Sequence, residues 1–395
     1  MFLTEHEEYL SVLARLREER SRIATLLPQV PAALRKAYEQ ETPPFSIILM
    51  NRVEECAPVR MDAPLNLLAA RGSVSLTGCM SAKDTPLELY DVTSMHDSII
   101  LFERANLMPT ANVRQMLAEA ASHGSIVLQE MDDHPNVNEA AARDHYFLFR
   151  AVSAVQTSTK YLADYLRKFN PYVYLFENQL AELPFARSYE GNASQVTIFF
   201  GALNRRADWE PLMPSINAAI QKHGDRLRFR VVSDYAFYQQ LRTEQKSYVG
   251  GTQDGSVVAP YERYVEELHA SDIALLPLND TEFNRAKSDL KFIEAAGNGA
   301  AVLAAPTVYA ATVRDGETGL IYRSPKEFAQ KLDLLIRRVD LRRTLAENAY
   351  RYVAEHRLLA QHLDDYIAAY REMFARREEL ERERLQRVEK FFPQC

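Results

Sequence analysis

The chain has 395 residues, of which 47% are apolar and 26% charged. This composition is typical of a globular protein with two to three domains and excludes an intrinsically disordered chain. The formal net charge of −7 argues against nucleic acid or an anionic membrane as the main partner, although local basic patches stay possible.

Cysteine use and the N-terminal sequence indicate the compartment. Cys56, Cys79 and Cys395 show neither paired nor metal-type spacing, which fits a reducing cytosol. The first ten residues are acidic and lack the order of a signal peptide. No apolar run approaches the ~18 residues that span a bilayer. We therefore expect a cytoplasmic protein.

Residues 1–42 are predicted to form a helical N-terminal extension. Thr4 and Glu7 form a capping box, and apolar residues recur at helical spacing up to Leu27. The extension fits packing on its own domain or on a second subunit equally well, so a homo-oligomer remains an open alternative.

Residues 43–187 alternate short apolar runs with helical stretches. Apolar strands that do not alternate with polar residues, separated by helices, indicate a parallel sheet covered on both faces. The predicted strands are 45–50, 73–76, 98–102, 125–132, 154–159 and 173–178, and the predicted helices are 64–71, 113–123, 139–149 and 160–169.

A polar stretch at 182–194 is predicted to link this domain to a second one at 188–345, where the alternation restarts. Two doubly wound, Rossmann-like α/β domains facing a cleft are the expected fold class. The predicted strands are 196–201, 228–233, 272–278, 300–304 and 319–322, the helices are 209–223, 261–270, 290–296 and 326–337, and 250–256 is a mobile-loop candidate.

The last segment, residues 346–395, is predicted to be almost entirely helical. Its end is a charged surface with a thin apolar edge formed by Leu380, Leu385, Val388 and Phe392. Such an edge fits a solvated helix, a partner surface or peripheral membrane contact.

The stretch 284–304 carries the main candidate site. Ser288 and Asp289 are good helix-starting residues. If a helix begins at Ser288, then Lys287, Lys291 and Glu294 lie along one side of it. Two cations near a helix N-terminus form a diphosphate site, and the carboxylate could bind a ribose. The same spacing also fits a solvated helix face.

Two further loops follow predicted strands. Asn204 and Arg205 come after the strand at 196–201, which places a cation at the carboxyl end of a parallel sheet. Asp132, Asp133 and His134 end the strand at 125–132, where such residues suit proton transfer or hydroxyl binding. Helix capping or a loop turn is the alternative for the two acids, as is packing for His134.

Several nucleotide and metal motifs are absent from the sequence. It contains no Asp-x-Asp, no Walker A sequence, no G-x-G-x-x-G and no serine nucleophile elbow. His and Cys are scattered, so we expect no metal site and no cofactor.

The segment Glu294–Leu303 resembles the donor-binding pattern E-A-x-A-x-G-x-P-V of GT-B glycosyltransferases, above all the family-4-like group 1 enzymes. The stretch after Gly201 is similar to their G-x-x-x-x-R segment, with Arg205 favoured over Arg206. Glu130 to Asp133 resembles the E-x-D-D segment of one bacterial branch. Two positions depart from the pattern, because Ala286 replaces the first acid of a Glu-x7-Glu pair and Ala300 replaces a proline.

The resemblance implies transfer of a sugar from a nucleotide-diphosphate sugar to a hydroxyl of a glycan, lipid-linked glycan or protein. Donor binding falls to Asn204, Arg205, Lys287, Ser288, Lys291 and Glu294, with Glu294 on the ribose. Retention of anomeric configuration is favoured, whereas Asp132, Asp133 or His134 acting as base would give inversion. A non-catalytic scaffold and a nucleotide-sugar epimerase are the alternative functions.

Overall fold

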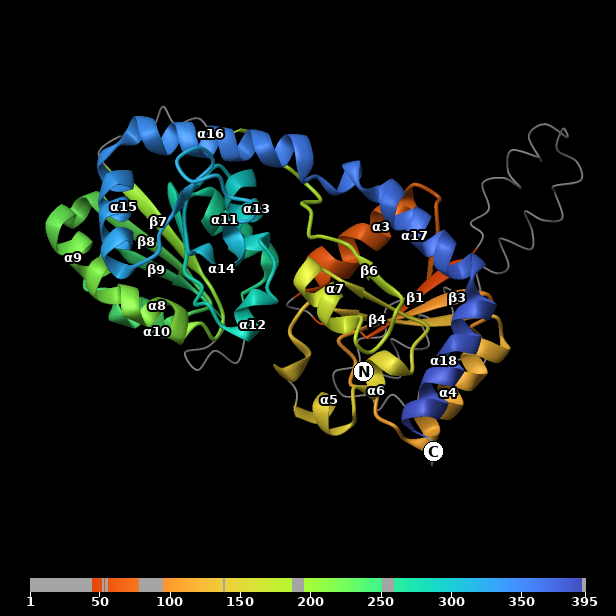
Figure 1. The fold of residues 1–395 in the computed structure, drawn as a ribbon. Helices are drawn as coiled ribbons and strands as arrows, with labels where there is room; N and C mark the ends of the chain where they lie inside the picture. The colour runs from red at the N-terminus through yellow and green to blue at the C-terminus, as the bar shows by residue number, and fades with distance from the viewer. Residues whose placement is uncertain are drawn as a thin grey trace, which may run out of the picture.

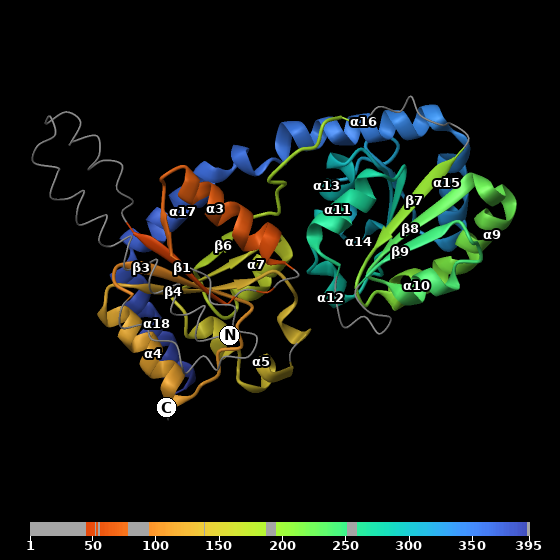
Figure 2. The same cartoon turned by 180° about the vertical axis from the view of Figure 1, so that it is seen from behind.

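The computed structural model describes residues 45–51, 53, 56–77, 95–137, 139–186, 195–250 and 259–392. The predicted N-terminal extension (1–42) and nearly all of the predicted loop at 250–256 lie outside these ranges. Figure 1 shows two α/β lobes side by side, and Figure 2 shows them from behind.

The first lobe is built on a parallel sheet with the order β2-β1-β3-β4-β5-β6. Its central strands β3 and β4 are buried along their whole length, as expected for a sheet covered on both faces. The strands are β1 (Ser46–Asn51), β2 (Ser75–Thr77), β3 (Ser98–Glu103), β4 (Ile126–Met131), β5 (Ala154–Thr157) and β6 (Val173–Leu175).

Helices of the first lobe agree with the predicted ones except at 139–149. That stretch is broken, because His145 and Tyr146 have φ angles of 51° and 57°, which a right-handed helix cannot contain. The elements are η2 (Pro58–Asp62), α3 (Ala63–Ala70), α4 (Ala111–Ser122), η4 (Pro135–Val137), α5 (Glu139–Arg143), α6 (Phe147–Arg150) and α7 (Lys160–Leu166).

The second lobe has the sheet order β12-β11-β10-β7-β8-β9. Numbered along the lobe, this is the order 3-2-1-4-5-6 read from one edge, which is that of a Rossmann fold. Edge strand β9 is half-exposed and was not predicted. The strands are β7 (Val196–Gly201), β8 (Leu227–Val232), β9 (Lys246–Val249), β10 (Ile273–Leu276), β11 (Ala301–Ala304) and β12 (Leu320–Ile321).

Helices cover both faces of this second sheet. Helix α9 packs with α15, and α13 packs with α11 and α16 (Figure 1). The elements are α8 (Arg206–Trp209), η5 (Glu210–Leu212), α9 (Met213–His223), η6 (Gly224–Arg226), α10 (Tyr235–Gln240), α11 (Tyr261–His269), α12 (Glu282–Arg285), α13 (Leu290–Gly297), α14 (Pro306–Tyr309) and α15 (Pro325–Arg337). The predicted pair of Rossmann-like domains is confirmed.

The chain returns to the first lobe at its C-terminal end. Helix α16 (Val339–His356) lies on the second lobe, whereas η7 (Leu359–Gln361), α17 (Leu363–Ala375) and α18 (Arg377–Phe391) lie on the first (Figures 1 and 2). Tyr366 and Tyr370 of α17 belong to the core that covers one face of the first sheet. Much of the predicted apolar edge is therefore internal, since Leu380 and Phe392 are buried, while Leu385 is 52% exposed.

The chain passes between the lobes twice, and the two connecting segments meet at Leu180 and Leu358. Leu180 and Leu358 form a parallel β-bridge, and Arg357, only 6% exposed, donates to Asn178 O at 2.7 Å and to both carboxylate oxygens of Asp289 at 2.6 and 2.9 Å. A buried guanidinium held by a bidentate carboxylate fixes orientation as well as position. The crossing thus orients the start of α13 relative to the first lobe.

No helix among the described residues is long and apolar enough to cross a membrane.

Truncation of Tyr370 should destabilise the first lobe. Its ring is 1% exposed and its hydroxyl donates to Gln156 Oε1 at 2.9 Å. Tyr370→Ala should cost about 3–5 kcal/mol, and Tyr370→Phe about 1–3 kcal/mol because a buried acceptor loses its partner. Urea unfolding followed by circular dichroism measures both values.

Leu385→Ala on the exposed side of α18 is the matched control and should stay within about 0.5 kcal/mol of the parent. Trp209, the sole tryptophan, is buried in the second lobe and reports on that lobe by fluorescence. Equal unfolding midpoints for all four proteins would show that α17 does not stabilise the first lobe.

Candidate functional site

The segment between α12 and α13 carries the predicted donor residues. Its chain turns through Lys287, whose backbone N–H donates to Asn284 O at 3.1 Å. Helix α13 begins at Leu290, where the predicted helix at 290–296 begins, so Lys287 and Ser288 precede the helix instead of belonging to it. The Ser288 hydroxyl instead accepts from Asn178 Nδ2 at 2.7 Å, and Asp289 binds Arg357. The two side chains therefore bind Asn178 and Arg357, which lie on the segments that connect the lobes, and the Asp289 side chain does not cap the helix.

Arg205 and Lys287 gather around one aromatic ring. The Arg205 guanidinium carbon lies 5.7 Å and the Lys287 Nζ 4.7 Å from the centre of the Phe283 ring. Arg205 also donates to Asn284 Oδ1 at 2.7 Å and lies 3.4 Å from Asp208 Oδ2. The two cations predicted for the diphosphate thus lie on the same side of the second lobe.

The loop after β7 positions these groups. Asn204 has a φ angle of 54°, a left-handed conformation that asparagine adopts more readily than most residues. The chain then enters α8, where Arg206 pairs with exposed Glu210 at 2.7 Å. Arg205, rather than Arg206, therefore points to the α12–α13 segment.

Lys291 and Glu294 form the inner part of the site. Lys291 Nζ donates to Gly201 O at 2.8 Å. Burial lowers the pKa of Lys291 and raises the pKa of Glu294. Tyr261 and Tyr264 donate hydrogen bonds to Glu294, which is 3% exposed. The predicted ribose contact of Glu294 would thus have to compete with two tyrosine hydroxyls.

Asp132 and Asp133 follow β4 and approach the second lobe. The carboxylate of Asp133 forms a short ion pair with Lys287 Nζ and lies 3.2 Å from Arg104 Nη2. Asp132 binds Arg104 Nε at 2.5 Å. Burial would raise the pKa of Asp132, but the Arg104 charge and hydrogen bond outweigh it and lower the pKa. The acidic loop and the donor segment are therefore in direct contact.

His134 lies beside this contact and is 2% exposed. Its Nδ1 accepts from Asn136 N at 3.2 Å, so that nitrogen carries no proton. Its Nε2 is buried without a hydrogen-bond partner and lies 3.5 Å from Glu282 Oε1 in α12. The ring is thus held by the acidic loop and faces the second lobe.

The predicted residues are joined by a buried polar path through Arg60, Glu130 and Asn178. Arg60 in η2 donates to Glu130 Oε1 at 2.8 Å, to Phe176 O at 2.6 Å and to Asn178 Oδ1 at 2.9 Å. Asn178 in turn donates to Ser288. Glu130 lies two residues before Asp132 in the chain. The acidic loop is therefore connected to the donor segment by the hydrogen bonds from Glu130 through Arg60 and Asn178 to Ser288.

Glu103 and Arg104 are further residues that carried no predicted role. Glu103 ends β3 and accepts from Val53 N at 2.6 Å and from Cys56 Sγ at 3.2 Å. Burial raises the pKa of Glu103 to about 7. Arg104 has a φ angle of 50°, an uncommon backbone conformation that is found mainly where function or tight packing requires it. The sequence signal for both residues is their position directly after the predicted strand at 98–102.

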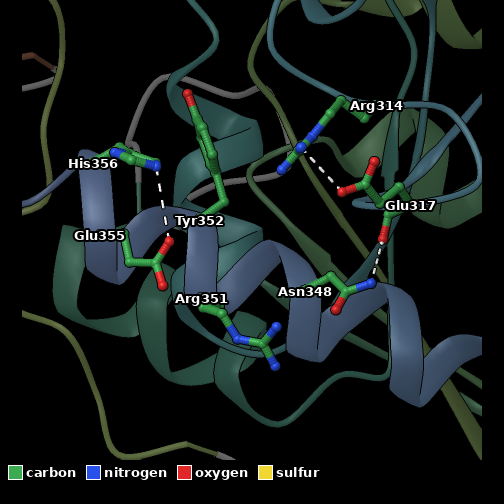
Figure 3. Close-up of a pocket in the computed structure, with 7 residues that line it drawn as sticks. All are labelled: Arg314, Glu317, Asn348, Arg351, Tyr352, Glu355 and His356. Atoms are coloured by element: carbon green, nitrogen blue, oxygen red, sulfur yellow. Dashed lines mark hydrogen bonds and ion pairs between the residues drawn. The ribbon is translucent and has the colours of Figure 1, made fainter.

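A shallow pocket on the second lobe lies apart from these residues. Figure 3 shows it on α16 and the loop before β12, where Arg314 and Glu317 pair at 3.0 Å and Asn348 donates to Glu317 O at 3.0 Å. It is lined by Arg314, Glu317, Asn348, Arg351, Tyr352, Glu355 and His356. None of the predicted site residues contributes to it. Within the described ranges, no three His, Cys, Asp or Glu side chains gather as a metal site would require.

Comparison with known proteins begins with the family match. Residues 214–389 match a family model described as glycosyl transferase-like. No curated protein sequence matches the chain.

Solved structures give the second comparison. A glycosyltransferase from Rickettsia africae aligns with a TM-score of 0.56 and 13% identity over 83% of this chain and 98% of its own. Anabaena Alr3699/HepE in complex with UDP-glucose aligns with 0.56 and 12%, over 82% and 98%. A mutant of S. aureus TarM, crystallised with fondaparinux, α-GlcNAc-glycerol and UDP, aligns with 0.50 and 12% over 71% of this chain, which spans 56% of TarM.

These matches agree with the two Rossmann-like lobes and with the resemblance noted in the sequence. The chain therefore has the two-lobed GT-B fold of these structures, and residues 214–389 resemble the glycosyl transferase-like family.

Proposed function

We propose that the protein transfers a sugar from a nucleoside-diphosphate donor to a hydroxyl acceptor. The observation that carries this proposal is the gathering of Arg205, Lys287 and Lys291 at the carboxyl end of the second sheet, directly against the acidic loop of the first lobe. In open α/β sheets this end is where ligands bind.

The three cations suit a diphosphate leaving group. As the glycosidic bond breaks, negative charge grows on the phosphate oxygens, and cations fixed beforehand stabilise that charge without reorganisation. Lys287 and Arg205 would hold the phosphates, with Asn204 and Ser288 at the loop ends. Lys291, deeper in the site, would add positive potential, and Glu294 would reach the ribose once its tyrosine partners shift.

Each of these cations lies beside a carboxylate. Lys287 pairs with Asp133, Arg205 lies beside Asp208, and Glu294 attracts Lys291. A diphosphate would therefore exchange with Asp133 at Lys287. The released carboxylate would stay anchored by Arg104 at the boundary between the lobes, where an acceptor hydroxyl would arrive.

Retention of configuration is the stereochemical outcome that we propose. Asp132 is held by Arg104, and its lowered pKa makes it a poor base. His134 already uses Nδ1 as an acceptor, and its Nε2 faces Glu282. A donor phosphate oxygen that takes the acceptor proton needs neither side chain, which favours the retaining route.

We further infer that transfer proceeds without a divalent cation, because the three side-chain cations supply the charge that a metal would. The acceptor is a glycan, a lipid-linked glycan or a protein hydroxyl. A cytoplasmic location fits the three cysteines without paired spacing.

A scaffold function is the second candidate. Ala286, at the position of the missing family acid, is fully buried, packs with the core of the first lobe, and its carbonyl accepts from Thr159 Oγ1 at 3.3 Å. This position therefore serves contact between the lobes. Binding and hydrolysis assays with a panel of nucleotide sugars separate the candidates, because a scaffold would turn over none of them.

Replacing Lys287 should abolish most donor turnover. Lys287→Ala should lower kcat for donor hydrolysis or transfer by about 10²–10³-fold, the usual effect of losing one charge-stabilising group. The measurement is release of nucleoside diphosphate from the best donor of the panel. Lys222→Ala, which removes a 60% exposed lysine paired with Asp333, should keep full activity. Equal rates for the two variants would contradict the assignment of Lys287.

Removing the charge of Asp133 should strengthen diphosphate binding. In Asp133→Asn the phosphates no longer compete with a carboxylate for Lys287, and a partly buried pair of this kind is worth about 1 kcal/mol, or about fivefold in affinity. Titration calorimetry with UDP measures the Kd. Asp164→Asn, at an exposed pair with Lys160, is the control. An unchanged or weaker Kd in Asp133→Asn would refute the exchange at Lys287.

A further inference from the structure

A row of aromatic side chains leads away from the acidic loop over the first lobe. It begins at buried His134, whose ring centre lies 4.8 Å from that of Tyr165. Tyr165 and Phe169 follow at 5.6 Å, and Phe169 stacks on Tyr146 at 4.0 Å. We call His134, Tyr165, Phe169 and Tyr146, together with Asn136, the aromatic ridge.

Helix α7 supplies the central part of the ridge. Tyr161, Tyr165 and Phe169 follow each other every four residues, so they lie along one side of the helix and the turn after it. Tyr165 and Phe169 are half-buried, with an inner side packed on the core of the first lobe. The Arg150 guanidinium carbon lies 5.2 Å from the centre of the Phe169 ring, so this ring also borders a cation. Helix α7 lies on the side of the first lobe nearest to α12 (Figures 1 and 2).

Polar atoms are placed among these rings. The Tyr146 hydroxyl donates to Asn136 Oδ1 at 2.9 Å and the Tyr165 hydroxyl to the same oxygen at 3.4 Å. The two hydroxyl oxygens lie 3.3 Å apart, and Asn136 is exposed. Both tyrosine oxygens keep lone pairs that can accept further hydrogen bonds.

The backbone that places Tyr146 has an uncommon conformation. His145 and Tyr146 both adopt left-handed φ angles, which are strained for non-glycine residues and are found most often at functional sites. The turn is closed by Tyr146 N donating to Ala141 O at 2.7 Å. Without this turn, a continuous helix over 139–149 would carry the ring elsewhere.

We propose that the aromatic ridge binds the saccharide part of the acceptor. A pyranose ring has an apolar face of C–H groups and a rim of hydroxyls, and the ridge offers half-buried aromatic rings with hydroxyl acceptors and an exposed amide between them. Its inner end touches the loop that contacts Lys287, so a bound sugar chain would direct one end to the donor. This proposal rests on the proposed function and specifies its acceptor as carbohydrate.

A lipid surface fits the ridge less well. Large exposed apolar side chains in the described residues are Met108, Leu175, Phe185, Leu385 and Phe391, and none of them is a ridge residue. Three of the four ridge rings are tyrosine or histidine and so carry polar atoms. Lys168 Nζ lies 4.5 Å from the centre of the Tyr165 ring. Contact through mixed rings and hydroxyls is what a polar ring-shaped ligand requires.

The test uses the full-length chain with UDP present on an array of hexoses, N-acetylhexosamines, heptoses and their short oligomers. Binding to a subset is expected, with affinity reduced about tenfold or more in Tyr165→Ala, as for other aromatic contact residues. Tyr165→Phe, which keeps the ring, should lose less than fivefold. Phe185→Ala removes a ring that is 97% exposed and outside the ridge, and should bind like the parent.

Three outcomes would overturn the proposal: no saccharide binds, Tyr165→Ala and Phe185→Ala bind alike, or the ridge instead governs binding to phosphatidylglycerol vesicles. Thermal melting of each variant confirms folding, and Tyr165→Phe tests the ridge if Tyr165→Ala does not fold. The Kd for UDP should be the same in all variants. Failure of the parent to bind UDP would count against the proposed donor function alone, since saccharide binding is scored separately.

Discussion

The ion pair between Lys287 and Asp133 is the contact on which the candidate site depends, because it joins the donor segment of one lobe to the acidic loop of the other. Neither residue lies within a helix or strand. Lys287 is placed by the turn between α12 and α13, and Asp133 by the end of β4. Two sheets that point their carboxyl ends at each other bring such loops together, and the pair is the point where they meet.

Buried hydrogen bonds keep the two loops in register. Arg357 binds both Asp289, at the start of α13, and the carbonyl of Asn178, in the segment that connects the two lobes. Arg60 binds the side chain of the same Asn178 and that of Glu130 in β4. Buried charges are costly unless they are fully paired. Loss of any one partner would therefore leave a buried arginine charge uncompensated. The two loops are thereby held in place by the protein's own hydrogen bonds.

Charge balance gives the site its chemical character. Acids lie beside the cations, and this avoids leaving buried like charges together. On the proposed function, a dianionic diphosphate would replace the Asp133 carboxylate because it offers more oxygens and more charge. Donor binding would then be coupled to the state of the acidic loop, which would help the protein to present the acceptor side only with a bound donor.

Much of this architecture could be predicted from the sequence. Unbroken apolar runs such as those of β3, β4 and β7 identify buried parallel strands, and the basic loop at Arg205 and the acids at Asp132 and Asp133 follow strands directly. Half-exposed β9 lacks such a run.

The rest depends on contacts between residues far apart in the chain. Asp289 looked like a helix cap because its partner Arg357, 68 residues away, is not visible locally. The break at His145 and Tyr146 likewise follows from tertiary packing, which overrides local helix propensity. The pairing of Asp133 with Lys287, 154 residues apart, could be found only in three dimensions.

The most direct measurement of the central claim is a crystal structure of the full-length chain with UDP. We expect the diphosphate within hydrogen-bond distance of Lys287 Nζ and Arg205, with Asp133 separated from Lys287 and still held by Arg104. A diphosphate bound elsewhere, or one bound while Lys287 remains paired with Asp133, would contradict it.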